Sequence, residues 1–448
     1  MRRFVQVLPV LAVLALTACS NGAMNQSFFP SNASSAAGGS GDVPFVGFNA
    51  VRQLCPAPQM PDHMQCFASV RTDVMPTLAQ GTSQATGNAE TCPFPLGYCP
   101  NDLQQAYNLP SLTAGQGKVV AIVDAYGYHH AASDLAAYRK KMGLKACSTT
   151  TGCLRILNQE GHTSPLPNEP SPNDDWRGED SLDLDMVSAI CPNCKIVYIQ
   201  TNNDYTNNLY AGVKEAGLLA KYIGNSWGGK PEGSDNSIFH QTGHVITAAA
   251  GDNGGGGRNG GPIQPCTYTY VVCVGGTHLV RAAGKRGWSE TVYNDFNDSS
   301  CSGGCGATGS ACSTKIAKPS WQTDKGCHMR SAADTSATAS LRAPVIVYNS
   351  EIPPTCTPPN CFWYFGGTSA STQIINAAYA LAGNADSQNG ASYLWSHHKG
   401  HIYDVLHGNN VDPARGVTCA SPLHYICNAV YGFDGPTGWG TPNGVGAF

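Results

Sequence analysis

A continuous apolar stretch at residues 118–126 constrains the fold more than any other part of the sequence. It reads KVVAIVDAY and is bounded by Gly117 and Gly127. A strand with one face in water alternates apolar and polar residues, so a run without alternation predicts a strand buried on both faces, as in parallel sheets. Such a sheet needs helices packed on both of its sides.

The rest of the chain alternates between strand-like and helical patterns. Further strands are predicted at 154–158, 195–200, 222–226, 244–250, 270–274, 345–348 and 362–365, and helices at 131–142, 179–190, 206–221 and 373–381. This alternation predicts an α/β fold with a doubly wound, mostly parallel sheet flanked by helices. Ligands of such sheets bind beyond the carboxyl ends of the strands, so polar residues that follow strands are the site candidates.

The N-terminus has the pattern of an export signal. Two arginines precede an apolar run at residues 4–16, which is too short to span a bilayer as a mature helix. The run ends in LTAC, which resembles the lipobox of bacterial lipoproteins, in which the cysteine, here Cys19, becomes lipidated. We expect a signal peptide at 1–19 and a flexible tether at 20–41. The alternative is an ordinary signal peptide.

Export places the chain in an oxidising compartment, where cysteines pair. We expect a protein outside the cytoplasm, lipid-anchored to a bacterial membrane or secreted, and favour the outer membrane where a cell has two because Ser20 follows Cys19. Eighteen of the 19 cysteines remain besides Cys19, which predicts up to nine disulfides that mostly close short loops. Seven close pairs (55/66, 92/99, 147/153, 191/194, 266/273, 356/361 and 419/427) and one cluster (301, 305, 312 and 327) stand out.

The composition argues against nucleic-acid binding. Charged residues make up 12% of the chain, compared with roughly 25% in an average protein. The net charge is −4, and no cluster of Lys and Arg recurs after the first three residues. Residues 42–95 form a short segment rich in Pro and Cys, which is either a pro-segment or a decoration of the main domain predicted at 96–448.

Ser369 is the first candidate for chemistry. It lies in GGTSAS, residues 366–371, between an aromatic strand and a predicted helix. A serine at a helix start has an accessible hydroxyl, and its own N–H has no partner within the helix. Both features suit a nucleophile. The alternative is a serine that only caps the helix.

Three carboxyl groups are further candidates. Glu179 and Asp183 are four residues apart, which puts both on one helix face, where two coupled carboxyl groups have shifted pKa values that acid–base chemistry can use. Asp252 follows a predicted strand in the glycine-rich stretch AGDNGGGG. The alternatives are solvated acids at a helix start and an aspartate that stabilises a turn.

A Ser–His–Asp enzyme is the weaker prediction. Asp124 ends the strand at 118–126, where the aspartate of a subtilisin-type triad would lie. No matching His-Gly-Thr helix start follows, and none of the 13 histidines lies in a recognisable triad motif.

In chain order, the Glu-x-x-x-Asp helix, the Asp-x-Gly after a later strand, and Gly-Thr-Ser-Ala resemble the sedolisins, the serine-carboxyl peptidases. The resemblance runs from about residue 97 to residue 448 and includes Asn-Ser-Trp-Gly-Gly at 225–229 and Thr-Gly-Trp-Gly at 437–440. It implies a subtilisin-like fold and hydrolysis of peptide or protein substrates at acid pH. Gln373 stands where the family usually has proline.

The resemblance also implies a role for each residue. Ser369 would be the nucleophile, Glu179 its general base, Asp183 the group that orients Glu179, and Asp252 the acid that donates to the oxyanion. Ser226, Trp227 and Gly228 would form the strand that pairs with the substrate backbone.

A calcium site near the C-terminus is implied as well. Asp404 and Asp434 would supply carboxylates, and Val405, Val430 and Gly432 would supply carbonyl groups, which are ligands that suit Ca²⁺.

Two other classes of function stay open, and we expect a monomer in each case. One is a non-catalytic surface lipoprotein that binds peptide or another polymer on a peptidase scaffold. The other is a hydrolase such as a glycosidase, in which Glu179 and Asp183 would flank a sugar.

Overall fold

The computed structural model describes residues 50–448, except for gaps at 56, 58–59, 77–91, 172–173, 231, 256–260, 299–300, 302, 353–355 and 420. The described residues belong to one compact unit, Val43–Phe448. The predicted signal peptide, Cys19 and tether lie outside them. Among the described helices, none has the length and apolar character needed to cross a membrane.

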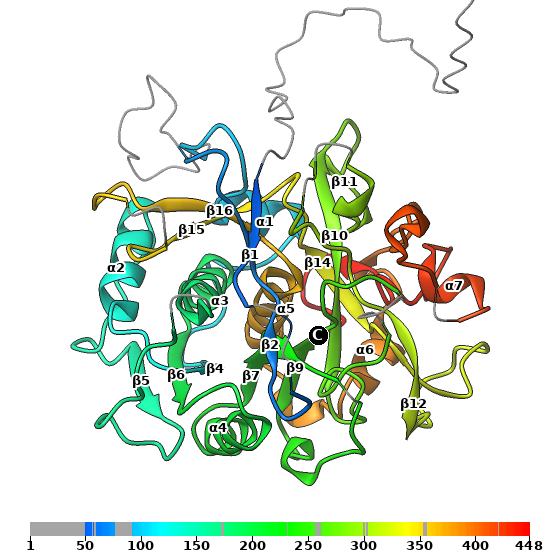
Figure 1. Cartoon of the computed structure of the whole chain (residues 1–448), viewed down its shortest axis with the longest axis horizontal. Coiled ribbons are helices and arrows are strands. Elements are labelled where there is room, and N and C mark those ends of the chain that lie inside the picture. The colour runs from blue at the N-terminus through cyan, green and yellow to red at the C-terminus, as the bar shows by residue number, and fades with distance from the viewer. Residues whose placement is uncertain are drawn as a thin grey trace, which may run out of the picture. The chain divides into compact units, whose positions relative to one another are not determined.

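An eight-stranded sheet forms the core of this unit (Figure 1). Its order is β11-β10-β9-β7-β4-β6-β5, with β14 also paired to β10. Neighbouring strands are parallel except for β11, which is antiparallel to β10. The predicted α/β fold is therefore confirmed. The strands are β4 (Val119–Ala125), β5 (Leu154–Asn158), β6 (Lys195–Thr201), β7 (Tyr222–Asn225), β9 (Val245–Ala249), β10 (Val272–Arg281), β11 (Trp288–Val292) and β14 (Thr335–Thr338).

The long helices are α2 (Ala131–Lys141), α3 (Trp176–Ile190), α4 (Thr206–Leu219) and α5 (Thr368–Ala382). Helices α3, α4 and α5 pack on this sheet, and α2 packs on α3. Helices α3 and α5 contact each other on one side of β6, β4 and β7, and α4 lies on the other side (Figure 1). Every residue of α3 except Arg177, and every residue of α5 except Ala382, is buried. A carboxylate on α3 therefore has no route to water and needs a partner or a proton.

A smaller, antiparallel sheet has the order β1-β3-β16-β15. Its strands are β1 (Val51–Gln53), β3 (Ser69–Arg71), β15 (Val345–Tyr348) and β16 (Phe362–Gly366). The expectation that 345–348 adds a strand to the parallel sheet is wrong. The chain runs from β15 to β16 without a crossover helix, so the two strands pair with each other.

Shorter elements complete the fold. Strand β2 pairs with β8, β12 with β13, and β17 with β18. The β2–β8 pair brings the N-terminal segment to the end of the main sheet. These elements are β2 (Gln65–Cys66), β8 (Trp227–Gly228), β12 (Ala311–Ala317), β13 (Met329–Ala332), β17 (Ile402–Tyr403), β18 (Thr441–Pro442), α1 (Pro100–Ala106), α6 (Ser392–His397) and α7 (His424–Cys427), with 3-10 turns at Ser237–Phe239, Asp295–Asn297, Ala385–Ser387 and Pro413–Arg415.

The helix predicted at 373–381 begins earlier than expected, at Thr368. Gly367 caps it with φ 103°, a left-handed conformation that favours glycine. Serine and threonine are as common in caps and turns as in helices, so the first turn was not recognisable from sequence. Ser369 consequently lies inside the first helical turn.

All nine predicted disulfides form. The seven close pairs are bridged as expected, and the cluster resolves into Cys301–Cys305 and Cys312–Cys327. Cys191 and Cys194, only three residues apart, form one of these bridges. So many disulfides indicate a protein that resides outside the cytoplasm.

Candidate active site

Helix α3 brings carboxyl groups into the core. Glu179 and Asp183 are fully buried and share one side of the helix, as the spacing predicted, so the charge of Glu179 acts on Asp183. Glu179 Oε2 accepts a hydrogen bond from the N–H of Ala68 at 2.8 Å. Glu179 Oε1 has no well-formed hydrogen bond to any described residue. This oxygen is therefore free to accept a proton.

Ser369 reaches the same place from α5. It is fully buried, and its hydroxyl donates to the carbonyl oxygen of Ser226 at 3.2 Å. The Ser369 side chain also interacts with Glu179 and partly offsets the rise in the pKa of that carboxyl group. Because Ser369 is the second residue of α5, its N–H belongs to the first turn, where N–H groups have no acceptor within the helix.

Gln373 completes a polar network one turn further along α5. Its Nε2 donates to Asp183 Oδ2 and lies 3.0 Å from Ser226 Oγ, and Ser226 Oγ itself donates to Asp183 Oδ1 at 2.8 Å. Both oxygens of Asp183 are thereby held in fixed positions. Gln373 thus acts directly on Asp183, one member of the carboxyl pair. Sequence reasoning identified the departure and missed this contact, because it depends on how α5 packs on α3.

Asp252 follows β9 and contacts the start of α5. Its Oδ1 accepts hydrogen bonds from the N–H and hydroxyl of Thr368, at 2.9 and 2.8 Å. Its Oδ2 borders Gly367, since a Cβ placed on that glycine would lie 2.7 Å away. In the described part of the chain Oδ2 has no well-formed hydrogen bond, although the nearby Tyr293 hydroxyl partly offsets the rise in pKa.

Burial raises the pKa of every carboxyl group in this cluster. The pKa of Asp252 rises to about 7. Burial raises the pKa of Glu179 well above its ordinary value, and the charge of Asp124 raises it further. Asp183 shifts in the same direction for the same causes, with Glu179 adding to them. Each shift favours the protonated form of its carboxyl group, and the interaction of Glu179 with Asp183 favours a proton shared between the two.

Asp124 and Asp180 belong to this cluster although sequence reasoning gave them no place in it. Both are fully buried, and neither has a well-formed hydrogen bond to the residues that the structure describes. Burial raises the pKa of Asp124 to about 8. Asp124 in turn raises the pKa values of Glu179 and Asp183. The sequence did contain one signal for Asp124: it is an aspartate near the carboxyl end of a buried strand, where ligands of parallel sheets bind.

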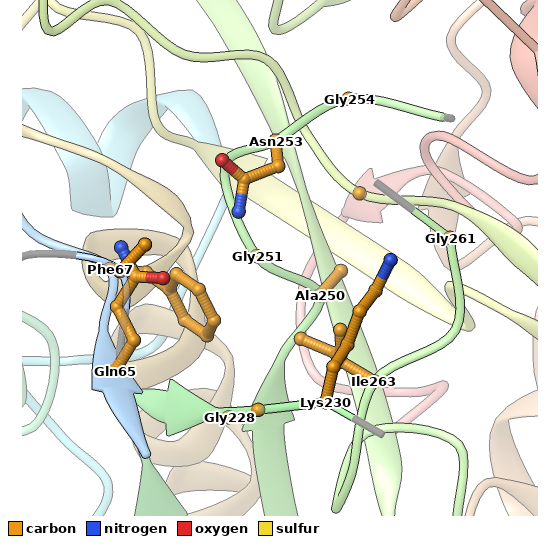
Figure 2. Close-up of a pocket in the computed structure, with 13 residues that line it drawn as sticks. Gln65, Phe67, Gly228, Lys230, Ala250, Gly251, Asn253, Gly254, Gly261 and Ile263 are labelled. Carbon is orange, nitrogen blue, oxygen red and sulfur yellow. The ribbon is translucent and has the colours of Figure 1, made fainter. Parts of the chain in front are cut away.

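Residues 226–228 run along the edge of this site. The Trp227 indole N–H donates to the carbonyl oxygen of Val123 at 2.7 Å, which fixes the strand on the main sheet. Gly228 pairs with Gln65, and Trp227 with Cys66. Figure 2 shows Gln65 beside Gly228 and the ring of Phe67 directed toward the turn at Gly251. A cavity of about 110 Å³ borders Phe67, Gly228 and Gly251.

The region expected to hold calcium brings two carboxyl groups together. Burial raises the pKa of Asp434 to about 8, and the charge of Asp404 adds to the rise. Asp404 Oδ1 is buried without a hydrogen-bond partner among the described residues. Val430 and Gly432 direct their N–H groups at these carboxylates, at 3.1 and 2.8 Å. Two adjacent carboxylates and an unpaired oxygen fit a hard cation.

One other group of potential ligands lies close together in the described residues: Cys92, Cys99 and Asp102. Its two cysteines form a disulfide, and Asp102 accepts a hydrogen bond from the Cys99 N–H, so the group is structural.

Two curated proteins are similar to this chain. Kumamolisin from Bacillus sp. (strain MN-32) is 30% identical over 376 residues, which cover 78% of this chain and 63% of kumamolisin. Sedolisin from Pseudomonas sp. (strain 101) is 25% identical over 403 residues, which cover 82% of this chain and 61% of sedolisin. The chain thus spans about three fifths of the length of these relatives.

A solved structure extends the likeness to the fold. Pseudomonas sedolisin, described as a serine-carboxyl proteinase complexed with two molecules of pseudo-iodotyrostatin, matches with a TM-score of 0.59 at 20% identity. The match covers 78% of this chain and 96% of that one. No family model matches the chain.

The buried carboxyl groups predict that stability falls as pH rises. Asp124 has an ordinary pKa of 3.8 when unfolded and about 8 when folded, so the folded state binds more protons between these values. The free energy of unfolding should therefore decrease from pH 4 to pH 8. Asp124→Asn should make this slope shallower by up to about 1.4 kcal/mol per pH unit.

Urea unfolding at a series of pH values measures this slope. Asp386→Asn is the control, because that side chain is exposed and its pKa is lowered, which confines its effect to acid pH. An unchanged slope in Asp124→Asn would mean that Asp124 is ionised in the folded protein.

Proposed function

Because the chain belongs to the sedolisin and kumamolisin family of serine-carboxyl peptidases, we propose that it is an endopeptidase that cleaves peptide bonds at acid pH. One observation carries the proposal: the side chain of the buried Ser369 interacts with the buried carboxyl group of Glu179, which in turn interacts electrostatically with the buried carboxyl groups of Asp183 and Asp252. These groups come from three separate parts of the chain. Burial of carboxyl groups costs free energy because they lose their water, so a cluster of them in the core is unexpected unless it has a function.

In the proposed reaction, Ser369 Oγ attacks the carbonyl carbon of the substrate and Glu179 accepts the serine proton. Asp183 shares that proton with Glu179, because two coupled carboxyl groups do not both ionise easily. Ser226 and Gln373 donate to the two oxygens of Asp183 and keep it oriented. Glu179 then returns the proton to the leaving nitrogen.

Asp252 is proposed to stabilise the oxyanion. A carboxyl group donates a hydrogen bond only while it carries a proton, and the raised pKa keeps that proton in place below about 7. Its Oδ1 is occupied by Thr368, so Oδ2 is the atom left to face the reacting carbonyl. The Ser369 N–H would be the second donor.

The backbone of Ser226, Trp227 and Gly228 is proposed to pair with the substrate. A peptide in extended form would add a strand to this edge, which binds main-chain groups without regard to sequence. Substrates would accordingly be unfolded or flexible segments of proteins.

A second candidate is a non-catalytic lipoprotein that binds a peptide strand on the same scaffold. Residues 65–66 of the chain already pair with residues 227–228. This pairing favours the second candidate, because it shows that the edge can bind a strand without any reaction. The glycosidase alternative has no such support, since carboxyl groups that flank a sugar bond come from opposite sides of it. Location at a membrane through Cys19 is part of the proposal in either case.

A calcium ion is proposed to stabilise the C-terminal region. Asp404 and Asp434 would hold it with their carboxylates, and the bound charge would offset their mutual repulsion. Carbonyl groups of Val405, Val430 and Gly432 would complete the ligand set.

Removal of calcium should destabilise the protein. Dialysis against EGTA is expected to lower the thermal midpoint, and added Ca²⁺ should restore it because a ligand that binds only the folded state stabilises it. Asp434→Asn should lose this response, whereas Asp412→Asn, at the start of the 3-10 turn Pro413–Arg415, should keep it. A midpoint that does not respond to Ca²⁺ in the wild-type protein would contradict the proposed site.

Hydrolysis should depend on Ser369 and Glu179. Ser369→Ala and Glu179→Gln are each expected to lower kcat for an unrelated peptide by on the order of 10⁴-fold or more, because the parts of a triad act as a unit. The matched controls are Ser396→Ala, an exposed helical serine, and Asp185→Asn, a buried acid of α3 that bonds to Tyr348 instead. If the wild-type protein binds the peptide but does not hydrolyse it at any pH, the non-catalytic candidate would be favoured.

The pH profile should report on Asp252. We expect kcat/KM to fall as pH rises through about 7, because Asp252 then loses the proton that it donates. In Asp252→Asn the amide donates at every pH, so the fall near that pH should weaken or move upward. Asp252→Ala should lose about 10²- to 10³-fold in kcat at acid pH. An identical profile in wild type and Asp252→Asn would assign the fall to another group.

A further inference from the structure

Helix α5 carries a chain of side-chain donors that ends on Asp183. The chain starts at the sheet, where Asn376 Nδ2 faces the carbonyl oxygen of Ala121 at 3.4 Å, an atom that can only accept. The same Nδ2 donates to Gln373 Oε1 at 3.2 Å. The other end of the Gln373 amide is therefore Nε2, which carries two hydrogens. It donates to Asp183 Oδ2 and, at 3.0 Å, to Ser226 Oγ.

The contact with Gln373 also fixes the direction of the Ser226 hydroxyl. Ser226 Oγ accepts from Gln373 Nε2 and donates to Asp183 Oδ1 at 2.8 Å. Asp183 thus accepts a hydrogen bond at each of its two oxygens. An ionised carboxylate accepts at both oxygens, whereas a protonated carboxyl group carries a hydrogen that it must donate. The network therefore favours the ionised form of Asp183.

The packing of the sheet on α5 leaves room for this amide at one glycine. Gln373 is fully buried, and Gly224 of β7 lies directly against it. A Cβ placed on Gly224 would be 2.2 Å from Gln373 Oε1 and 2.6 Å from Nε2. Any side chain at position 224 would therefore push the amide away from its present place. The donation to Asp183 follows from how α5 and β7 pack.

The charged groups that act on Asp183 are acidic. Burial raises the pKa of Asp183 most, and the charges of Asp124 on β4 and Glu179 on α3 add to the rise. The hydrogen bonds from Ser226 and Gln373 oppose it. Helix α5 itself has no charged side chain. Neutral donors thus do the work that a cation would do beside an ordinary buried carboxylate.

The other elements packed on α3 present ionisable groups that interact elsewhere. These groups and their partners are Asp102 of α1 with Cys99, Asp134 and Arg139 of α2 with Ser350 and Ser188, Tyr198 of β6 with Asp180, and Tyr348 of β15 with Asp134. The ionisation of Asp183 consequently depends on the balance between two acidic neighbours and two neutral donors.

We propose that Gln373 is a positioning residue that sets the acid limit of hydrolysis: it stabilises the ionised form of the Glu179–Asp183 pair and keeps a base available at lower pH. The inference rests on the proposed function, in which Glu179 accepts the proton of Ser369. The pair can accept that proton only after it has lost one of its own two protons. A donor on Asp183 makes this first loss easier, because a hydrogen bond to the charged form of a group favours that form.

Gln373→Met removes the donor and keeps the length of the side chain. The acid limb of kcat/KM should move to higher pH by about one unit or more, because hydrogen bonds to charged groups are strong. Below that limb the variant should be slower than wild type by about tenfold or more. At the pH optimum it should approach the wild-type rate, and the fall near pH 7 that we assign to Asp252 should stay in place.

A second variant and a control complete the kinetic test. Ser226→Ala removes the other donor on Asp183 and should move the acid limb in the same direction, which gives an independent result if Gln373→Met does not fold. Gln388→Met is the matched control, because Gln388 is also buried and its amide donates to Asn384 Oδ1 at 3.1 Å instead. Its pH profile should match that of the wild type.

The ionisation of the pair is measured without hydrolysis by infrared spectroscopy. Difference spectra over a pH series follow the C=O band of protonated carboxyl groups, and Asp183→Asn identifies the part of the band that belongs to the pair. The first proton of the pair should leave at higher pH in Gln373→Met than in wild type.

The outcomes separate this inference from the proposed function. Hydrolysis with the same acid limb in wild type and Gln373→Met, or a loss of equal size at every pH, would overturn the role of Gln373 alone. A shifted carboxyl band in folded protein that does not hydrolyse peptides would support the effect of Gln373 on the pair and overturn the proposed function. An unchanged band without hydrolysis would overturn both.

Discussion

The burial of carboxyl groups between α3 and α5 determines how the rest of this structure is built. Glu179, Asp180 and Asp183 have no path to water, and Asp124 approaches them from β4. Isolated buried carboxylates would cost several kcal/mol each, so these groups need protons, donors or both. Gln373 and Ser226 supply donors, and shared protons supply the remainder. A cluster held together in this way is stable in acid, which is also where its proposed chemistry operates.

The sequence predicted the fold and the candidate residues better than it predicted how they meet. Apolar runs without alternation identified the parallel strands, and the spacing of Glu179 and Asp183 placed them on one helix face. The contacts of Asp124 and Gln373 could not be predicted, because both arise from the packing of elements far apart in the chain. The prediction that residues 345–348 join the parallel sheet was wrong, because a strand pattern does not specify which strand it pairs with.

The N-terminal segment was the least readable part of the sequence. Its prolines and cysteines fit either a pro-segment or a decoration of the main domain, and short strands such as residues 65–66 carry no periodic pattern. Only the structure shows that this segment lies against residues 226–228, next to Ser369. The edge that is proposed to bind a substrate strand pairs, in this structure, with residues 65–66 of the chain itself.

Direct detection of an acyl group on Ser369 would test the central claim. The protein would be incubated at acid pH with a peptide ester, quenched, and mapped by mass spectrometry. The account predicts that the acyl group is found on Ser369 in wild type and is absent from Glu179→Gln. An acyl group on another residue, or ester hydrolysis at the same rate in Ser369→Ala, would contradict the serine-carboxyl mechanism.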